Sequence, residues 1–236
     1  MEWQDEAIIL SVNPQGEHAA VVNLFTPQHG KWAGRVSGAQ GARKRAWLVP
    51  GNTVQAGWGA RLEEQLGSFS LELTNQRTAH IFDEPPRLMA LSYIATLTDQ
   101  CLTERLPLPL LYYAFNAACD ACLQQEARQV VIAYERALLD ALGYGLDLSA
   151  CAVTGQRHDL SHISPNTGRA VCREEAEPYG DRLLSLPGYW LNGATPTAAE
   201  LTIAAKVTGY FLIQHFYPPP RELPGLRAQL FAMSTN

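Results

Sequence analysis

The sequence has no run of about 18 apolar residues that could cross a bilayer, and it opens without the basic start and apolar core of a secretion signal. Its five cysteines are an odd number in a chain without an export signal, which favours reduced thiols over a disulfide framework. We therefore expect a cytoplasmic protein that does not enter a membrane. Hydrophobic residues make up 47% of the chain and charged residues 17%, which is ordinary for a folded globular protein.

Sequence motifs for catalysis are also missing. No P-loop, GxGxxG, GxSxG or HExxH pattern occurs, and the six histidines are scattered along the chain. Carboxylates such as Glu174, Glu175 and Glu177 form a charge run that is typical of a solvated helix start. The sequence therefore predicts a protein that is not an enzyme and uses no cofactor. The alternative is an enzyme acting on a small molecule, for which one unrecognised pair of nucleophile and base would be needed.

Acidic residues are missing from one stretch of an acidic chain. The formal net charge is −5, yet residues 18–60 contain five basic residues and no Asp or Glu. Residues 1–80 are balanced, so the whole excess of negative charge lies in residues 81–236. Cations interleaved with flat aromatic rings suit the phosphates and stacked bases of a nucleic acid. The basic residues and tryptophans of this stretch are Lys31, Trp32, Arg35, Arg43, Lys44, Arg45, Trp47 and Trp58.

The first eighty residues have the pattern of a small β-barrel. Short runs rich in β-branched and aromatic residues are separated by turn clusters such as Asn13-Pro14 and Pro50-Gly51. Five strands in about eighty residues suit an OB-fold, with an SH3-like barrel as the alternative. Residues 38–45 are expected to form a polar, basic loop. The expected strands cover residues 6–12, 18–26, 31–37, 53–61 and 68–76.

From Pro85-Pro86 onward the hydrophobic period becomes helical. Gly143 marks a helix C-terminus, and Thr197 and Glu200 have the spacing of a capping box at a helix start. We therefore predict an α+β protein with two domains. A five-stranded, DNA-binding OB-fold barrel covers residues 1–80, and an α-helical bundle covers residues 81–236 with a loop-rich segment at 145–180. The expected helices cover residues 87–103, 110–126, 127–142, 197–216 and 226–233.

Two cysteines of the loop-rich segment have part of the pattern of a zinc site. A structural site made of two short Cys-x2-Cys clips would need ligands three residues after Cys151 and Cys172. Those positions hold Thr154 and Glu175, which are poor partners for two thiolates. We therefore expect a metal-free loop. Two histidines could substitute as ligands, namely His158 and His162.

The chain resembles the RecO family of bacterial recombination mediators. The stretch DEAIILSVNPQGEHAAVVNLFTPQHGKWAGRVSGA, with its later GARKR, is similar to the N-terminal barrel of that family. The stretch YERALLDALGYGLDLSACAVTG, residues 134–155, resembles the family's helix-to-loop signature more specifically. The similarity continues through SPNTGRAV and the terminal helices, so it covers essentially the whole chain.

The resemblance implies an OB-fold joined to a helical domain, and a role as mediator in the RecF pathway. Such proteins bind single- and double-stranded DNA, anneal complementary strands, and work with RecR to load RecA on DNA coated with single-strand-binding protein. That role implies a cytoplasmic protein associated with the nucleoid. Many members carry a four-cysteine zinc site, which only Cys151 and Cys172 match here, whereas Thr154 and Glu175 depart from it. The alternative is an adaptor whose barrel binds protein without direct DNA contact.

The residue pattern and the resemblance agree on a DNA-binding barrel. An OB-fold offers a groove in which bases stack on aromatic rings while Lys and Arg meet phosphates. The alternative is a solvated basic loop between strands, with the tryptophans in the core. We expect Trp58 in the core, and the DNA contacts at Lys31, Trp32, Arg35, Arg43, Lys44, Arg45 and Trp47.

The resemblance also implies that the helical domain docks the acidic, aromatic-ended tail of the single-strand-binding protein. Arg128, Ile132 and Arg136 are spaced by four residues, which places them on one helix face. The two guanidinium groups could pair with tail carboxylates while the isoleucine supplies apolar contact. The alternative is that both arginines form surface ion pairs with Glu126, Glu135 or Asp140. The next candidate for this role is Lys206.

Overall fold

The structure is a computed structural model that describes residues 1–62, 64–217, 219–220 and 222–233, and the chain divides into two compact units. The first unit joins Met1–Val130 to the segment from Leu226 onward, and the second unit is Val131–Gly225. The division proposed from the sequence, at residue 80, falls inside the first unit. Within the described ranges, every helix is too short or too polar to span a lipid bilayer.

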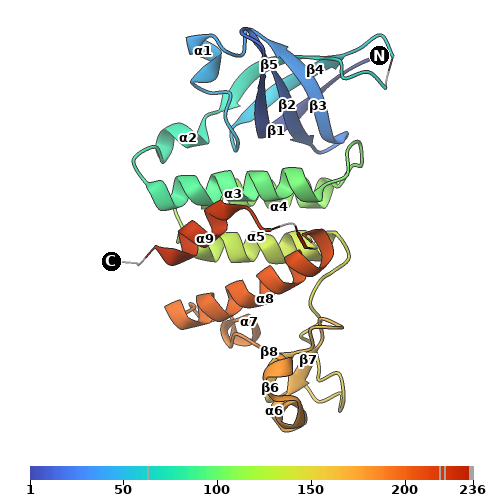
Figure 1. Cartoon of the computed structure of the whole chain (residues 1–236), viewed down its shortest axis with the longest axis vertical. Coiled ribbons are helices and arrows are strands. Elements are labelled where there is room, and N and C mark those ends of the chain that lie inside the picture. The colour runs from blue at the N-terminus through green and yellow to red at the C-terminus, as the bar shows by residue number, and fades with distance from the viewer. Residues whose placement is uncertain (63, 218, 221, 234–236) are drawn as a thin grey trace. The chain divides into compact units, whose positions relative to one another are not determined.

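The first unit contains the predicted five-stranded barrel (Figure 1). Its strands are β1 (Glu2–Gln15), β2 (Ala19–Thr26), β3 (Gly30–Ser37), β4 (Thr53–Gly59) and β5 (Ser68–Asn75). They lie in the order β1-β2-β3-β5-β4, and β4 also pairs with β1. The neighbours are antiparallel except β3 and β5, which run parallel and meet at the bridge between Arg35 and Ser68. An α+β protein with an OB-like barrel, as the sequence pattern predicts, is therefore confirmed.

The barrel interior is filled by side chains that alternate along the strands. Ala7 and Ile9 of β1 lie in this core together with the large rings of Trp32, Trp58 and Phe69, none of which exposes more than 6% of its surface. The rings of Trp32 and Trp58 meet edge to face with their centroids 5.1 Å apart. Aromatic rings of this size bury a large area each, so they supply much of the apolar stabilisation of a small barrel.

Helices α3 (Pro85–Cys101) and α4 (Pro109–Ala121) pack on the outside of the barrel and lie below it in Figure 1. Ile8 and Leu10 alternate with the inward residues of β1, yet both are completely buried. The outward ring of Phe25 meets Tyr112 of α4 with ring centroids 5.5 Å apart. The middle of β1 is therefore buried on both faces, which explains its continuous apolar run.

A buried arginine joins the barrel to these helices. Arg77, at the start of the short helix α2 (Arg77–His80), is 2% exposed and donates to the Asp120 carboxylate and the Asn116 amide oxygen at 2.7 Å each. The same guanidinium donates to the Gly51 carbonyl and the Thr53 hydroxyl of the barrel. One planar guanidinium thus donates hydrogen bonds both to the barrel and to helix α4.

Two glycines allow the close approach of barrel and helices. Gly51 has a φ of +90°, and a Cβ atom there would lie 2.5 Å from Cγ of Leu91. Gly30 has a φ of +71°, and a Cβ atom there would overlap the Leu106 carbonyl. Both positions combine left-handed backbone with a lack of space, so they require glycine.

The second unit is mainly helical. Helix α5 (Ala127–Ala141) begins in the first unit and continues into the second. The predicted capping box is present at the start of α8 (Ala198–Phe216), where Thr197 accepts from the Glu200 backbone and Glu200 accepts from the Thr197 backbone. The segment 145–180 contributes two short strands to a small sheet of order β7-β6-β8. The remaining elements are α1 (Ala42–Arg45), β6 (Leu160–Ile163), β7 (Ala170–Cys172), α6 (Arg173–Ala176), η1 (Glu177–Arg182), β8 (Leu184–Ser185), α7 (Tyr189–Asn192) and α9 (Gly225–Ala232).

Candidate nucleic-acid interface

The expected basic loop is partly helical. After a turn at Gly38, whose φ is +67°, residues Ala42–Arg45 form the short helix α1. Lys44 donates through Nζ to the Ser37 carbonyl at 2.8 Å, which ties the helix to the end of β3. Arg43 and Arg45 are exposed, and within the described residues neither forms an ion pair. The local structure therefore presents two free guanidinium groups to solvent.

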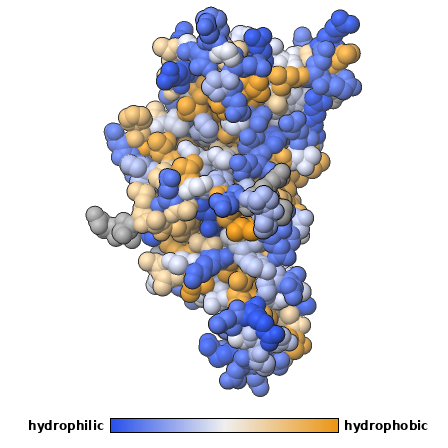
Figure 2. Space-filling view, in the orientation of Figure 1, coloured by the Kyte–Doolittle hydropathy of each residue, from blue (hydrophilic) through white to orange (hydrophobic). Residues whose placement is uncertain are grey.

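A third exposed arginine lies on the neighbouring strand. Arg35 and Ser37 both point outward from β3 and are roughly 7 Å apart along the strand. Because Lys44 binds the Ser37 carbonyl, Arg35 lies near the end of β3 that anchors α1. Figure 2 shows hydrophilic surface over this end of the barrel. We refer to the exposed arginines on and next to this end of β3, namely Arg35, Arg43 and Arg45, as the arginine surface.

Lys31 does not contribute to this surface. Its side chain is 12% exposed, donates to the Asp99 backbone carbonyl at 2.6 Å and lies 3.7 Å from the Asp99 carboxylate. Asn23 of β2 donates to the same carboxylate at 2.8 Å. Helix α3 therefore covers the part of the β2–β3 face where Lys31 lies. Its charge already has a partner, which counts against Lys31 as a DNA contact, and that contact stays a prediction.

The tryptophans divide between core and rim. Trp32 is 6% exposed in the barrel core, and the guanidinium of Arg105 lies 4.6 Å from its ring centre. The expectation that Trp32 stacks on bases is therefore not met, because the ring is buried in the barrel core. Trp58 is buried, as expected. Trp47 lies two residues after the end of α1, is only half-buried, and remains the candidate for stacking.

Sequence reasoning missed one cation near the barrel opening. Arg61 is exposed after β4 and lines a hollow of about 840 Å³ with Trp3, Trp58 and Phe69. The residue lies one position beyond the acid-free stretch and is followed by two glutamates, so local charge gave no signal. Its nearness to Ser68, which pairs with Arg35, follows from the strand register.

The predicted row on α5 does not form one surface. Ile132 is 1% exposed and offers no apolar contact to a partner, so this part of the prediction is wrong. Arg128 donates to the Glu126 carboxylate at 2.8 Å and lines a hollow with Arg87 and Leu230. Its charge is thus already paired, as the alternative of surface ion pairs anticipated.

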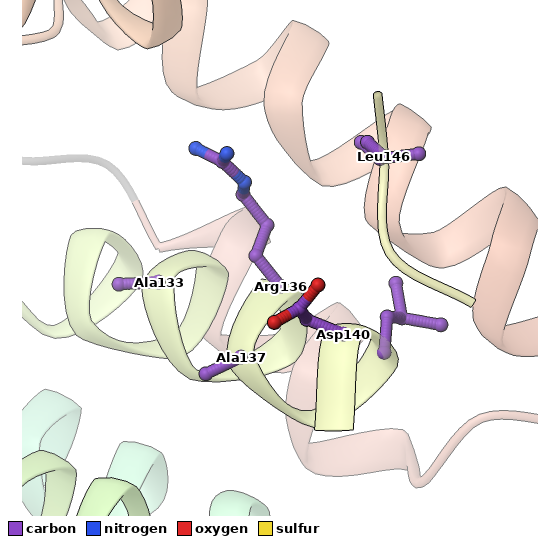
Figure 3. Close-up of a pocket in the computed structure, with 6 residues that line it drawn as sticks. Ala133, Arg136, Ala137, Asp140 and Leu146 are labelled. Carbon is purple, nitrogen blue, oxygen red and sulfur yellow. The ribbon is translucent and has the colours of Figure 1, made fainter. Parts of the chain in front are cut away.

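Arg136 lines a different hollow, of about 400 Å³, together with Ala133, Ala137 and Asp140 (Figure 3). The figure shows its side chain extending away from α5 into this space. Its guanidinium lies 4.3 Å from the ring centre of Trp190. Burial lowers the pKa of Arg136, but an arginine so placed stays charged at neutral pH. Lys206 on α8 is exposed.

Of the four positions expected for a zinc site, Cys151 and Cys172 carry thiols. The sulfur atoms of Cys151 and Cys172 are 3.4 Å apart, and the Thr154 hydroxyl is 4.0 Å from the Cys172 sulfur. Burial disfavours the Cys151 thiolate, but backbone N–H donors from Thr154 and Cys172 outweigh it and lower the pKa of Cys151 to about 6. Glu175 lies in α6. Nowhere in the described ranges do three Cys, His, Asp or Glu side chains gather as metal ligands, so these residues do not fit a structural zinc ion.

Comparisons with known proteins cover both parts of the chain. The family model described as "Recombination protein O N terminal" matches residues 1–77, and the model described as "Recombination protein O C terminal" matches residues 83–224. The protein named "DNA repair protein RecO" from Rhodospirillum centenum is 43% identical over 219 residues, which cover 92% of this chain and 88% of that protein.

Two further relatives carry the same name. The protein from Rhodospirillum rubrum is 41% identical over 236 residues, covering 96% of this chain and 94% of its own length. The protein from Phenylobacterium zucineum is 40% identical over 233 residues, which cover 98% of this chain and 96% of that protein. Both family models and this level of identity along nearly the whole chain agree, so the chain belongs to the RecO family of DNA repair and recombination proteins.

Proposed function

We propose that this protein binds single- and double-stranded DNA through the arginine surface and anneals complementary strands. The observation that carries the proposal is the exposure of Arg35, Arg43 and Arg45, without ion pairs among the described residues, in a stretch that has no acidic residue. Free guanidinium groups bind phosphates without competition from nearby carboxylates. Trp47, half-buried beside α1, supplies one ring on which a base can stack.

Binding through phosphates explains both the breadth and the weak sequence preference of the proposed activity. Phosphate contacts fix the position of a strand but do not read its bases. Single and double strands both present phosphates, so the same cations can serve both. Annealing then needs no covalent chemistry, because neutralised phosphates repel each other less and two bound strands meet at high local concentration.

We also propose the mediator role that the family suggests. The protein would work with RecR in the RecF pathway to load RecA on DNA coated with single-strand-binding protein, at the nucleoid. The coat must be recognised for this to happen. We place the docking of its acidic, aromatic-ended tail at the Arg136 hollow, where a cation lies beside the apolar surfaces of Ala133, Ala137 and Trp190.

The salt dependence of DNA binding tests the proposed function. The variant Arg35→Ala/Arg43→Ala/Arg45→Ala removes three exposed cations. The slope of log K against log salt should become less negative by about 2–3, at roughly 0.7–0.9 per lost phosphate contact. The variant should also slow strand annealing. The unfolding midpoint should not change, because none of the three side chains is buried.

A matched control removes the same charge elsewhere. Arg157→Ala/Arg173→Ala/Arg182→Ala deletes three exposed arginines of the second unit and should leave the salt slope unchanged. Equal slopes in wild type and in the arginine-surface variant would rule out this interface. Wild-type protein that gives no salt-dependent shift of a labelled oligonucleotide would favour the adaptor alternative.

A further inference from the structure

Two buried thiols lie close together in the second unit. The sulfur atoms of Cys151 and Cys172 are 3.4 Å apart, each residue is 1% exposed, and the Cys172 backbone N–H donates to the Cys151 sulfur at 3.3 Å. The other two positions of the family's zinc site hold Thr154 and Glu175, which do not complete a ligand set. We propose that Cys151 and Cys172 form a reversible disulfide that replaces the metal as the cross-link of this part of the fold.

The backbone around both cysteines holds them in this arrangement. The Cys151 N–H donates to the Gln156 carbonyl at 2.8 Å, and the neighbouring Ala152 N–H donates to the Ala170 carbonyl at 2.8 Å. Cys172 is the last residue of β7 and is paired with Leu160 of β6. The two thiols are therefore positioned by strands and turns rather than by their own contact. To form the bond, the two sulfur atoms must approach from 3.4 Å to about 2.0 Å.

The apolar cluster around the thiols is small. Its buried members are Cys151, Val171, Cys172 and Ala176, with Leu160 and Leu183 partly buried at its edge. A core of this size contributes little to stability, and folds with small cores commonly add a metal ion or a disulfide. Since the ligand set for a metal is incomplete here, a covalent bond between the remaining thiols is the cross-link that the residues allow.

The chemistry is thiol–disulfide exchange with a low-molecular-weight disulfide such as oxidised glutathione. Because both cysteines are buried, this part of the fold must first open locally. The thiolate of one cysteine then attacks that disulfide, whose S–S bond breaks, so a mixed disulfide forms and one glutathione thiolate leaves. The thiolate of the second cysteine then attacks the protein sulfur and expels the other glutathione. Overall, two protein thiols lose two electrons and two protons, and one glutathione disulfide becomes two glutathione thiols.

The same chain contains a reference pair that should not react. Cys119 and Cys122 lie on or next to α4, and burial raises the pKa of Cys122 to about 12 and that of Cys119 further. Thiolate is the attacking species, so these thiols should stay reduced in the folded protein. Equal oxidation of all four cysteines would indicate that the oxidant acts on unfolded chains. Oxidation of Cys151 and Cys172 alone would indicate specific pairing in the folded protein.

The test is a redox titration of the full-length protein. The chain is equilibrated in glutathione buffers from reducing to oxidising, free thiols are trapped by alkylation, and cross-linked peptides are identified by mass spectrometry. We expect one intramolecular link between Cys151 and Cys172, loss of two hydrogen masses, full reversal by dithiothreitol, and a higher melting temperature for the oxidised form. In Cys119→Ser/Cys122→Ser the link should form unchanged.

Several outcomes would overturn the proposal. One is that both cysteines remain reduced in the most oxidising buffer while the same chain in urea oxidises readily. Another is separate glutathione adducts on Cys151 and Cys172 instead of an internal link. A third is that the purified wild-type protein holds one equivalent of zinc that prevents oxidation. Because all three readouts use the wild-type chain, the test holds even if Cys119→Ser/Cys122→Ser fails to fold. The redox titration does not depend on whether the protein binds DNA.

Discussion

At the scale of single residues, Arg77 connects the barrel to helix α4 within the first unit. Its guanidinium is buried and bonded to acceptors on the barrel and on α4. A buried charge in this position is stable because each of the three guanidinium nitrogens donates to an oxygen. Lysine could not replace it, since a single ammonium cannot reach the separated acceptors.

The variant Arg77→Ala should lower the free energy of unfolding by about 3 kcal/mol, near the lower bound for breaking a buried ion pair, because Asp120 is 52% exposed and can be hydrated. Arg77→Lys should recover only part of the loss. Urea denaturation measures both. The matched control Arg87→Ala, at a pair with both partners partly exposed, should cost less than about 1 kcal/mol. Equal losses at the two sites would contradict the assigned role.

Single residues also mark where sequence reasoning succeeded and where it could not. The alternation of Trp32, Gly34 and Val36 already placed these residues on one side of a strand, and that side is the barrel interior. The partner of Lys31 could not be found in the same way. Asp99 lies 68 residues further along the chain, and no local pattern reports a contact of that range.

At the scale of elements, the strands were predictable because each has its own period or apolar run, and the capping box of α8 because its two residues are local. The burial of the α5 face was not. A spacing of four places Arg128, Ile132 and Arg136 on one side of a helix, but it does not say which side packs inward. The neighbours of the helix decide that, and they bury Ile132.

The two arginines of this row, Arg128 and Arg136, should behave differently in a test of the proposed docking site. Arg136→Ala should weaken binding of an acidic peptide with an aromatic C-terminus by about 10- to 100-fold, the value of one charged hydrogen-bonding group. Arg128→Ala should have little effect, because its charge is paired with Glu126. Fluorescence anisotropy with the labelled peptide measures both variants.

Binding to naked oligonucleotide is the control, and neither α5 variant should change it. Annealing of bare strands should also be normal in Arg136→Ala, whereas annealing of strands coated with single-strand-binding protein should fail. If Arg136→Ala bound the peptide as tightly as wild type, the docking site would have to lie elsewhere, with Lys206 as the next residue to test.

At the scale of the whole molecule, two divisions of the chain do not coincide. The family models meet between residues 77 and 83, close to the change of sequence pattern, whereas the compact units divide at Val130. The reason is physical. Helices α3 and α4 belong by sequence to the helical part, but they cover Ile8, Leu10 and Phe25 of the barrel.

A fragment of residues 1–80 should therefore not fold cooperatively. It would expose the outward apolar residues of β1 and β2 and leave Arg77 without Asn116 and Asp120. A fragment of residues 1–130, which keeps α3 and α4, should melt in a sharper transition and show stronger near-ultraviolet circular dichroism. A sharp melting transition in the shorter fragment would show that the barrel is stable without its helical cover.

The seam between β3 and β5 is short, and we expect the barrel to widen most easily there. β2 and β3 pair over eight residues, whereas the described residues of β3 and β5 pair at Arg35 and Ser68 alone. Each backbone hydrogen bond contributes about 1 kcal/mol, so the strand ring can widen at this seam while the longer ladders stay intact. Arg35 is both a seam residue and a member of the arginine surface. A DNA strand held there would slow the exchange of the Arg35 amide hydrogen, which is bonded to the Gly67 carbonyl, with solvent.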